Sequence, residues 1–355
     1  MTFLLLAVAA FFITGTVLPL FSHDHWVIRF FDFPRVQLSG GIVLTLAGFL
    51  VVGPSTVVDY GTMALLGVCL VYQIDHILSY TPLAPLQVKE ATDDGKATDK
   101  ISFLVANVEI ENRNAGSLLD LIDEEDPDLV LAIETDEWWM RQLRPLQDDF
   151  PHTLEHPQED AYGMCLYSKY PLVDPTVRFL VEDDVPSIHT KVALPSGTHV
   201  WFHGMHPRPP HPTHDPDTTE RDAEMILLAQ ELQDRDELTV VGGDLNDVSW
   251  SYTTRLFQNI SGLLDPRVGR GFYSTFHARY PFLRYPLDHT FHSEHFLLSQ
   301  LEVLPYIGSD HFPVLLELDY HPDAENHHDE PEANGQDEAQ AQHELEKLEE
   351  KRNSE

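Results

Sequence analysis

Three long apolar runs before Pro85 constrain this chain more than any other feature of its sequence. They cover residues 2–21, 36–53 and 61–80, and the first two contain no charged side chain. Each run is close to the roughly 20 residues with which an α-helix crosses the hydrocarbon core of a bilayer. The runs therefore predict about three transmembrane helices. A cleaved signal peptide is an alternative for the first run, but no basic segment precedes it and no clear cleavage site follows it.

The loop between the first two runs bears on how the chain would lie in a membrane. It contains Arg29 and Arg35, and a count of positive charges keeps this loop and the C-terminal part of the chain in the cytoplasm. The same loop reads WVIRFFDFPR, an aromatic and basic mixture that suits either membrane interface. The sequence predicts a multi-pass anchor and leaves the side of the membrane open.

The composition changes near Pro85 and again near Tyr320, which divides the chain into three regions, the second of which begins with a polar linker. We expect a transmembrane anchor over 1–85, a polar linker over 86–100, a globular domain over 101–320 and an acidic tail over 321–355. The tail contains almost no large apolar residues, so it is expected to be disordered or a solvated helix. Its two possible states are not separated by the sequence.

The segment 101–320 has short β-rich runs that alternate with a few amphipathic stretches. This pattern predicts one α/β domain of about 220 residues. We expect strands over 102–107, 129–133, 163–167, 199–205, 238–242, 289–291 and 314–318, and helices over 117–124, 137–147 and 218–233. The two cysteines, Cys69 and Cys165, imply no disulfide framework.

The net charge limits the partners of this domain. With 58 acidic and 22 basic side chains, the formal net charge is −36. Proteins that bind long nucleic acids neutralise phosphates with clustered Lys and Arg, and this chain would repel a polyanion except at a local metal or arginine site. A binding surface for a long duplex is therefore not expected.

The stretch VVGGDLND, residues 240–247, is the sharpest indication of chemistry in the sequence. A β-rich run ends at Gly242 and Gly243, and Asp244 and Asn246 follow two positions apart. Alternation along an extended chain directs residues i and i+2 to the same face, so a carboxylate and an amide converge. The alternative is an ordinary Asp/Asn turn after a buried strand.

Further polar residues stand at or just beyond the predicted strand ends. Burying so many acids, amides and imidazoles would cost desolvation energy that ordinary folding avoids, which indicates a functional site. Carboxylate-rich sets suit a hard cation such as Mg²⁺ or Mn²⁺. The candidates are Asn107, Glu134, His203, Asp244, Asn246, Asp288, Asp310 and His311.

Seven motifs together resemble the endonuclease/exonuclease/phosphatase superfamily. They are NVEIENRN, AIETDEWW, GMCLYSKYPL, WFHGMHPRPP, VVGGDLND, LDHTF and GSDHFPVL, and they cover about residues 101–320 in the family's order. The resemblance implies a four-layer α/β/β/α sandwich, preceded here by about three transmembrane helices. It also implies cleavage of phosphoester bonds with a divalent metal, in substrates that range from lipids and nucleic acids to small phosphates. The N-terminal helices resemble those of membrane-anchored bacterial members, which implies a place in the cell inner membrane.

The resemblance implies roles for the oxygen and amide groups. Glu134 matches the metal-binding glutamate, Asn107 the asparagine beside it, and Asp310 a residue that helps to bind metal or water. Asp244 matches the aspartate that orients or deprotonates the attacking water. Asn246 matches the amide that holds the phosphate.

The resemblance also implies roles for histidines. His311 would be held by Asp288 and, as an imidazolium, would contact the phosphate or assist the leaving oxygen. His203 resembles the second histidine that contacts the phosphate, although the acid that supports it in deoxyribonuclease-type members is not assigned here. Asp288 has an alternative role as a structural partner of His289.

Several basic residues leave alternatives open. The loop HGMHPRPPHPTH provides competitors for His203 and could form a Zn²⁺ cluster, although its spacing lacks a compact ligand set. Arg208 in this loop is a candidate contact for the substrate phosphate. Four other arginines form either an anion-binding rim or solvated loops: Arg267, Arg270, Arg279 and Arg284.

The function expected from these observations is a membrane-anchored phosphoesterase that depends on a divalent metal. It would hydrolyse a phosphodiester or a phosphomonoester with a metal-activated water. One alternative is a nuclease that acts on DNA or RNA. Another is a catalytically silent membrane scaffold that uses the sandwich as a binding surface.

Overall fold

The apolar N-terminal runs form long helices in the computed structural model of the chain, which describes residues 2–21, 24–92, 97, 99–210, 217–321 and 323–354. The chain divides into two compact units. One comprises residues 1–85 with 210–218, and the other comprises residues 86–209 with 219–355. Below they are called the helical unit and the sandwich domain.

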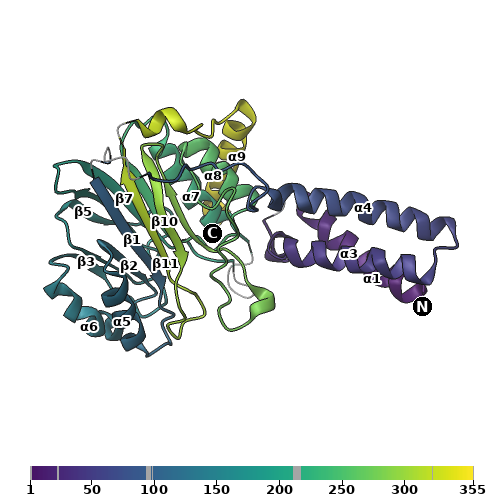
Figure 1. Ribbon diagram of the computed structural model, residues 1–355, viewed down its shortest axis with the longest axis horizontal. Coiled ribbons are helices and arrows are strands. Elements are labelled where there is room, and N and C mark those ends of the chain that lie inside the picture. The colour runs from purple at the N-terminus through teal and green to yellow at the C-terminus, as the bar shows by residue number, and fades with distance from the viewer. Residues whose placement is uncertain are drawn as a thin grey trace. The chain divides into compact units, whose positions relative to one another are not determined.

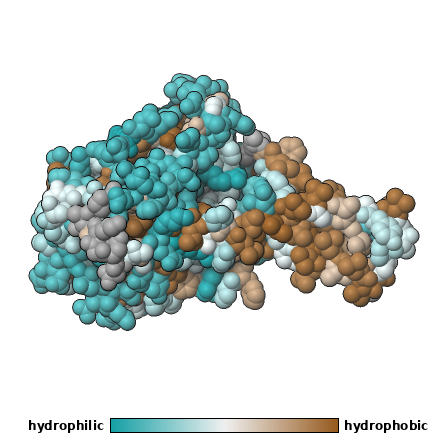
Figure 2. Space-filling model, turned by 45° about the horizontal axis from the view of Figure 1, so that its top comes forward, coloured by the Kyte–Doolittle hydropathy of each residue, from teal (hydrophilic) through white to brown (hydrophobic). Residues whose placement is uncertain are grey.

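The helical unit contains three helices that are long and apolar enough to cross a membrane. Their candidate spans are Thr2–Leu20, Arg35–Val52 and Val57–Leu78, and Figure 2 shows apolar residues over this unit and mostly polar ones over the sandwich domain. The Thr56 side chain and Asp59 form a capping box at the start of the third helix. The helices are α1 (Thr2–Val17), extended by η1 (Leu18–Leu20), α3 (Arg35–Val52) and α4 (Val57–Leu78), with the short α2 (Trp26–Arg29) and η2 (Phe30–Asp32) between α1 and α3.

Polar side chains join the three helices inside this unit. The Arg35 guanidinium donates to Gln73 at 3.0 Å, and the Gln73 amide donates to the Thr16 hydroxyl at 3.1 Å. All three side chains are buried. A buried polar network of this kind specifies one packing arrangement of otherwise similar apolar helices.

Within the described residues, the strands of the sandwich domain form two sheets (Figure 1). The six-stranded sheet has the order β10 (Phe296–Val303), β11 (Val314–Tyr320), β1 (Asp99–Asn107), β2 (Leu129–Ile133), β4 (Met164–Ser168) and β3 (His152–His156). The five-stranded sheet has the order β5 (Leu172–Arg178), β6 (Ser187–Ala193), β7 (His199–Met205), β8 (Thr239–Asp244) and β9 (Asp288–His292).

Helices cover the outer faces of both sheets. The six-stranded sheet packs on α5 (Ala115–Glu125) and α6 (Glu137–Leu143), which is followed by η3 (Arg144–Asp148). The five-stranded sheet packs on α7 (Thr219–Leu232) and α8 (Tyr252–Ser261). The two sheets bury a common core, in which the rings of Phe103 and Phe202 stack at 5.4 Å. The α/β/β/α sandwich predicted from the sequence is therefore confirmed.

One parallel pair in each sheet determines where the polar strand ends lie. β1 runs parallel to β2, with Asn107 opposite Ile133, and β7 runs parallel to β8, with Met205 opposite Gly243. The antiparallel β9 begins where β8 ends, so that Asp288 pairs with Asp244. Carboxyl ends of parallel strands share an edge of a sheet, which is where ligands bind in many α/β proteins.

The C-terminal segment differs from a disordered tail. Residues Gly335–Ser354 form the helix α9, which packs on α7 and α8 (Figure 1). Its few apolar residues lie at helical spacing, and Ala341 and Leu348 are buried against the sandwich domain. Lys351 pairs with Glu220 of α7 at 2.6 Å. The few apolar residues of α9 are enough to pack it on the sandwich domain, although the average composition of the segment is highly polar.

The segment expected as a polar linker is partly fixed to the sandwich. Val88 is fully buried in the core between the sheets. The Lys89 amide donates to His328 at 2.9 Å, and the Ala91 amide donates to the Leu298 carbonyl at 2.8 Å. Residues 93–96 and 98 of the expected linker lie outside the described part of the chain. The first residues of this segment therefore belong structurally to the sandwich domain.

Candidate active site

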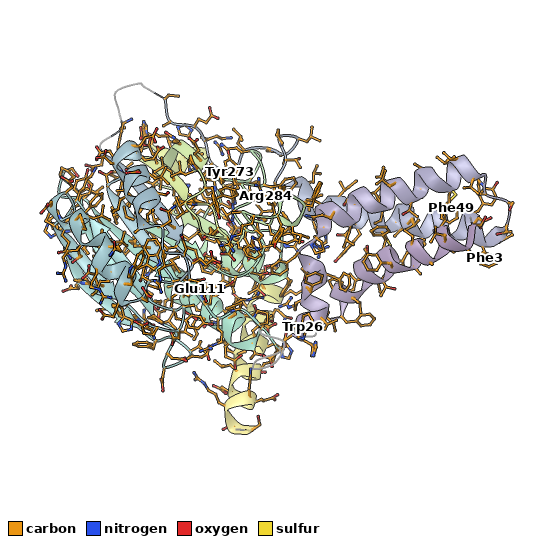
Figure 3. The ribbon with its side chains drawn as sticks, turned by 90° about the horizontal axis from the view of Figure 1, so that it is seen from below. Phe3, Trp26, Phe49, Glu111, Tyr273 and Arg284 are labelled. Carbon is orange, nitrogen blue, oxygen red and sulfur yellow. The ribbon has the colours of Figure 1, made fainter. Side chains whose placement is uncertain are left out.

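Polar residues at one end of the sandwich line a cavity of about 250 Å³. Glu134 follows β2, Asp244 and Asn246 stand at the end of β8, and Asp310 and His311 precede β11; all five line this cavity. Glu111, labelled in Figure 3, lines it as well. Glu134 and His311 are more than 170 positions apart in the sequence, yet both line the same cavity. The tertiary fold thus brings acidic groups from both sheets into one site.

Asn107 connects the two sheets at this site. Its side-chain Nδ2 donates to Oε1 of Glu134 at 2.8 Å and to Oδ2 of Asp244 at 3.0 Å. Its Oδ1 accepts from the Glu109 amide at 3.0 Å. Asn107 therefore presents its NH₂ group to two carboxylates, an arrangement in which it positions them rather than offering its oxygen to a cation.

Glu134 is a carboxyl group whose pKa is raised. Burial raises the pKa of Glu134 to about 7, with a further contribution from Asp244, although hydrogen bonds from Asn107 and the Ile110 amide oppose the shift. Its backbone φ of 63° lies in the left-handed region, which is uncommon for a residue with a side chain. Such local strain at the end of a strand is typical of functional positions.

Two polar side chains of the GDLND turn, those of Asp244 and Asn246, line the cavity. The backbone N–H of Asn246 donates to Oδ1 of Asp244 at 3.0 Å. The side-chain Nδ2 of Asn246 donates to the Pro207 carbonyl at 3.0 Å. At Gly243 an added Cβ would lie 1.9 Å from the Met205 carbonyl oxygen, so no larger residue fits. This is an Asp/Asn turn, as the alternative interpretation held, but one whose side chains also line a cavity.

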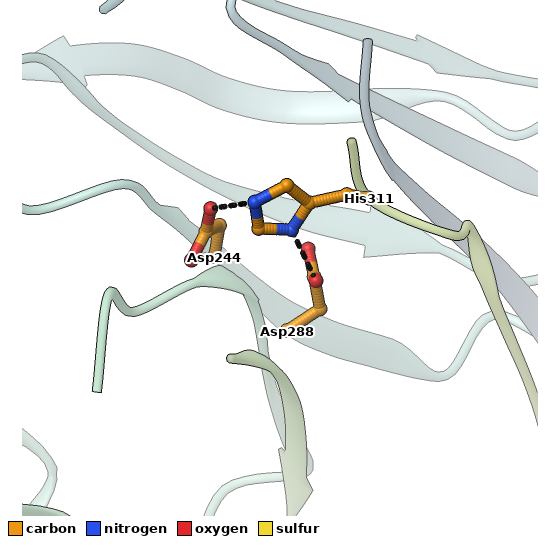
Figure 4. Close-up of side chains that lie close together, drawn as sticks. All are labelled: Asp244, Asp288 and His311. Carbon is orange, nitrogen blue, oxygen red and sulfur yellow. Dashed lines mark hydrogen bonds and ion pairs between the residues drawn. The ribbon is translucent and has the colours of Figure 1, made fainter. Parts of the chain in front are cut away.

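His311 lies between two buried aspartates (Figure 4). Its Nδ1 is 2.7 Å from Oδ2 of Asp288, and its Nε2 is 3.4 Å from Oδ2 of Asp244. Burial alone lowers the pKa of His311, but Asp288 and Asp244 outweigh burial and raise it to about 10. The imidazole is therefore a cation at neutral pH. His289 does not use Asp288, because its ring contacts Arg267 and the Asp247 carbonyl, each at 2.8 Å.

His203 lies away from this cavity, in contrast to the role expected from the sequence. Its Nδ1 is 2.6 Å from Nδ1 of His189, and its ring stacks on Trp201. Alternate residues of a strand point to opposite faces. Phe202 packs in the core between the sheets, so His203 lies on the opposite face of β7 with Met205, which packs on the helices.

His206 occupies the position expected for His203. It is the first residue after β7, and its Nε2 lies 4.0 Å from Oδ2 of Asp244. Burial lowers the pKa of His206 to about 4, so this imidazole is uncharged at neutral pH. The sequence contained a signal for this choice, since Val200 and Phe202 mark the core-facing positions of the strand.

Arg208 is engaged by protein carboxylates. It lies 2.9 Å from both Glu182 and Asp184, and its guanidinium lies 4.8 Å from the ring centre of Tyr162. Tyr162 lines the cavity, but Arg208 itself is not among the lining residues. The other histidines of this loop, His211 and His214, lie outside the described residues.

The four other arginines hold loops together. Arg267 is buried and paired with Asp265 at 2.8 Å, so it is neither solvated nor part of an anion-binding rim. The remaining three donate to backbone carbonyls: Arg270 to Val88, Arg279 to Gly308 and Arg284 to Ala278. Arg279 also pairs with Glu109.

The charges around the cavity favour a bound cation. Its described lining includes the carboxylates of Glu109, Glu111, Glu134, Asp244 and Asp310, but no Lys or Arg. Two imidazoles also line it, and only His311 carries a raised pKa. A phosphate would be repelled unless a cation compensated this negative charge, and oxygen ligands suit Mg²⁺ or Mn²⁺.

The side chains of Asp244, Asp288 and His311 lie close enough together to bind a metal, but they also interact with one another. Side-chain atoms of Asp244, Asp288 and His311 lie within 4.8 Å of one another. Both nitrogens of His311 face carboxylates in this group. We therefore interpret it as a triad joined by one hydrogen bond and one ion pair, and we expect Glu134 and Asp310 to be the better cation ligands.

Comparison with known proteins identifies the family. The model described as the Endonuclease/Exonuclease/phosphatase family matches residues 104–311, more than half of the chain. The chain belongs to this family. The family resemblance inferred from the sequence is thus confirmed. A search of curated proteins gave no match.

Solved structures share the fold of this endonuclease/exonuclease/phosphatase domain. An endonuclease/exonuclease/phosphatase from Beutenbergia cavernae DSM 12333 has a TM-score of 0.51 at 18% identity, over 62% of this chain and 72% of that one. An endonuclease/exonuclease/phosphatase from Bacteroides vulgatus has a TM-score of 0.52 at 16% identity, over 63% of this chain and 100% of that one. D. rerio TDP2, complexed with a single-strand DNA product, has a TM-score of 0.52 at 13% identity, over 62% and 99%.

Family membership supports a general class of chemistry. Members of this family are generally hydrolases of phosphate esters, include nucleases and phosphoesterases, and typically use divalent metals. The acidic and histidine groups described above are of the kind that bind a metal.

Proposed function

We propose that this protein is a membrane-anchored phosphoesterase that depends on Mg²⁺ or Mn²⁺ and hydrolyses a phosphodiester or phosphomonoester. The observation that carries the proposal is one cavity lined by Glu134, Asp244 and Asp310 together with His311, whose positive charge is maintained by Asp288. Hydrolysis of a phosphate ester requires a positioned water, neutralisation of the phosphoryl oxygens and a donor for the leaving oxygen. The residues around the cavity offer each of these functions.

Glu134 and Asp310 would hold the cation. Asn107 would keep Glu134 beside Asp244, since its amide donates to both carboxylates. When bound, the cation would neutralise charge on the phosphoryl oxygens and favour attack by water. The negative charge of the described lining residues supports this assignment.

Asp244 would orient the attacking water and accept its proton. Burial raises the pKa of Asp244, although His311 opposes the shift, so this carboxylate is a stronger base than an exposed one. The side-chain NH₂ of Asn246 donates one hydrogen bond to the Pro207 carbonyl. Its second N–H could donate to a phosphate oxygen. This division of roles follows from the two side chains that the GDLND turn directs into the cavity.

His311 would donate from Nε2 to a phosphoryl oxygen or to the leaving oxygen. Asp288 orients the ring by accepting a hydrogen bond from Nδ1. His206 would provide a second, uncharged imidazole on the same cavity, in the role that the sequence suggested for His203. Two histidines with different charge states give the site both an acid and a neutral donor or acceptor.

The membrane part of the proposal rests on the helical unit. Its three candidate spans support a multi-pass anchor in the cell inner membrane. The net charge of −36 disfavours a long duplex as a substrate. A nuclease remains the alternative within the family, and the DNA product bound to D. rerio TDP2 makes a short single strand a useful test substrate.

The test is hydrolysis of bis(p-nitrophenyl) phosphate by the full chain in detergent with Mg²⁺ or Mn²⁺. We expect EDTA to abolish the reaction. The substitutions Asp244→Ala and His311→Ala should each abolish it as well. Asp236→Ala is the control, because it removes an exposed His295 ion pair outside the cavity. Activity that survives both cavity substitutions would refute the proposed site. A panel of lipids, single-stranded DNA and small phosphates would then identify the substrate.

A further inference from the structure

A hairpin-like segment at the edge of the cavity has no role in the proposed hydrolysis. We call residues 276–285 the rim loop. The Phe276 amide donates to the Tyr285 carbonyl and the His277 amide to the Leu283 carbonyl, each at 3.0 Å. The 3₁₀ turn η4 (Pro281–Leu283) forms its tip. The rim loop therefore has a defined backbone with a base and a tip.

The base of the rim loop is part of the cavity. Phe276 lines the cavity, and its ring centre lies 4.9 Å from that of His311. The Ala278 amide donates to the Asp310 carbonyl at 2.6 Å. Arg279 pairs with Glu109, which also lines the cavity. These contacts hold the loop next to the residues proposed to bind phosphate and cation.

The tip of the rim loop exposes apolar side chains. Tyr280 is 57% exposed, Phe282 88% and Leu283 51%. Tyr306, which is 50% exposed, donates to the Gly308 carbonyl, and Arg279 donates to the same oxygen. Among the described residues of the sandwich domain, only Phe179 and Tyr252 are further exposed large hydrophobics. The exposed apolar surface of this domain is thus concentrated beside the cavity, which is typical of an interaction surface.

The length of the segment between α4 and the sandwich core indicates which partner the exposed tip of the rim loop contacts. Nine residues separate Leu78, the last residue of α4, from Val88, which is buried in the sandwich core. Even fully extended, such a link spans at most about 35 Å. Because α4 is long and apolar enough to cross a membrane, a bilayer surface lies within reach of the sandwich domain.

The chemistry of the rim loop suits that surface. Arg279 and Arg284 flank the apolar tip, and Figure 3 labels Arg284 together with Tyr273 just before the loop. Mixed aromatic, aliphatic and basic side chains are typical of segments that rest in a membrane interface. A nucleic acid is the less favoured occupant, because the chain carries a net charge of −36.

We propose that the rim loop inserts Tyr280, Phe282 and Leu283 into the interface of a phospholipid bilayer. The cavity then receives the phosphate ester of an amphiphile whose apolar part stays in that bilayer. The docking surface stands on the geometry of the loop, while the substrate class rests on the function proposed above. The phosphate group would lie at the base of the loop, and the apolar tip would contact the lipid chains.

A fluorescent label tests the docking surface without any requirement for turnover. Phe282→Cys is labelled with NBD in the full chain and reconstituted in phosphatidylcholine vesicles. The native thiols interfere little: Cys69 and Cys165 are buried, and burial raises the pKa of Cys165 to about 11. The matched control is Phe179→Cys, a second exposed aromatic position, 43% exposed, on the same domain. The unsubstituted chain gives the labelling background.

We expect emission from position 282 to shift to the blue and to be quenched about twofold by spin-labelled lipid, whereas position 179 responds as in water. Equal behaviour of the two positions would overturn the proposal. So would a label at position 282 that responds to single-stranded DNA and not to lipid, since the loop would then be a stacking platform.

Hydrolysis tests the substrate class. The variant Tyr280→Ser/Phe282→Ser/Leu283→Ser should hydrolyse a vesicle-embedded phosphate ester about tenfold more slowly and bis(p-nitrophenyl) phosphate at the original rate. Tyr252→Ser, at a side chain 37% exposed outside the rim loop, should change neither rate. Equal losses on both esters would overturn the inference. Lipid insertion without hydrolysis of any ester would support the docking surface and reject the proposed function instead.

Discussion

Oδ2 of Asp288, in the five-stranded sheet, accepts a hydrogen bond over 2.7 Å from Nδ1 of His311, in the loop that leads into the six-stranded sheet. Asp288 begins β9 of the five-stranded sheet, and His311 precedes β11 of the six-stranded sheet. Both side chains are buried. This contact therefore ties the relative position of the sheets to the charge state of a single imidazole.

Asp288→Asn tests that coupling. The amide cannot stabilise an imidazolium, so His311 would lose its main source of positive charge, and we expect kcat to fall about 100-fold with a smaller change in KM. Steady-state kinetics on bis(p-nitrophenyl) phosphate measures both. Asp236→Asn, which alters an exposed His295 pair at 3.3 Å, should leave kcat unchanged. A wild-type kcat in Asp288→Asn would exclude His311 as the acid.

Substitutions of His206 and His203 should have opposite effects. We expect His206→Gln to reduce kcat at least about tenfold, since this imidazole lines the cavity. His203→Gln should leave kcat close to that of the wild type but destabilise the fold by about 1–3 kcal/mol, because His189 loses its partner. Kinetics and thermal unfolding together separate the two cases, and a large loss of kcat in His203→Gln alone would contradict this assignment.

Glu134→Gln should weaken the use of the divalent cation. Because the amide carries no charge, the Mg²⁺ concentration at half-maximal rate should rise at least about tenfold, and added Mg²⁺ should restore part of the rate. A Mg²⁺ titration after EDTA treatment measures the effect. Glu155→Gln is the matched control, since Glu155 lies on β3 and is not among the described cavity residues. The same Mg²⁺ dependence in both variants would argue against Glu134 as a ligand.

Two buried histidines should lower the stability of the sandwich domain in mild acid. Burial lowers the pKa of His189 from 6.5 to about 4, and burial also holds the pKa of His203 well below 6.5. Between about pH 4 and 6.5 His189 binds more protons in the unfolded state than in the folded state, so its contribution to the free energy of unfolding decreases as the pH falls below 6.5. His189 alone should cost about 2 kcal/mol at pH 5.

Unfolding in urea at pH 7.5 and pH 5 measures this loss. The loss between the two pH values should be smaller in His189→Gln than in the wild type. His199→Gln, at an exposed position on β7, should retain the wild-type loss. An unchanged pH dependence in His189→Gln would show that this histidine does not contribute.

Local patterns in the sequence were enough for much of the fold. β2 and β7 have the bounds that apolar periodicity predicted, and the motif order indicated the family. β5 escaped prediction because it is an edge strand that contains Pro175 and has no fully buried residue, which leaves no clear alternation. The strands β3, β6 and β10 were not predicted either. Helix α9 escaped because its buried Ala341 and Leu348 stand in a highly charged segment.

The sequence by itself determined which chemical groups stand at strand ends, since these follow from the chain order of Asn107, Glu134, Asp244 and His311. Only the tertiary structure decided which of the histidines and arginines reach the cavity. The direction of His203 depends on which face of β7 packs on the other sheet, and the engagement of Arg208 depends on Glu182 and Asp184, more than 20 residues away. Contacts between distant segments are set by packing and charge compensation in three dimensions, which no local pattern records.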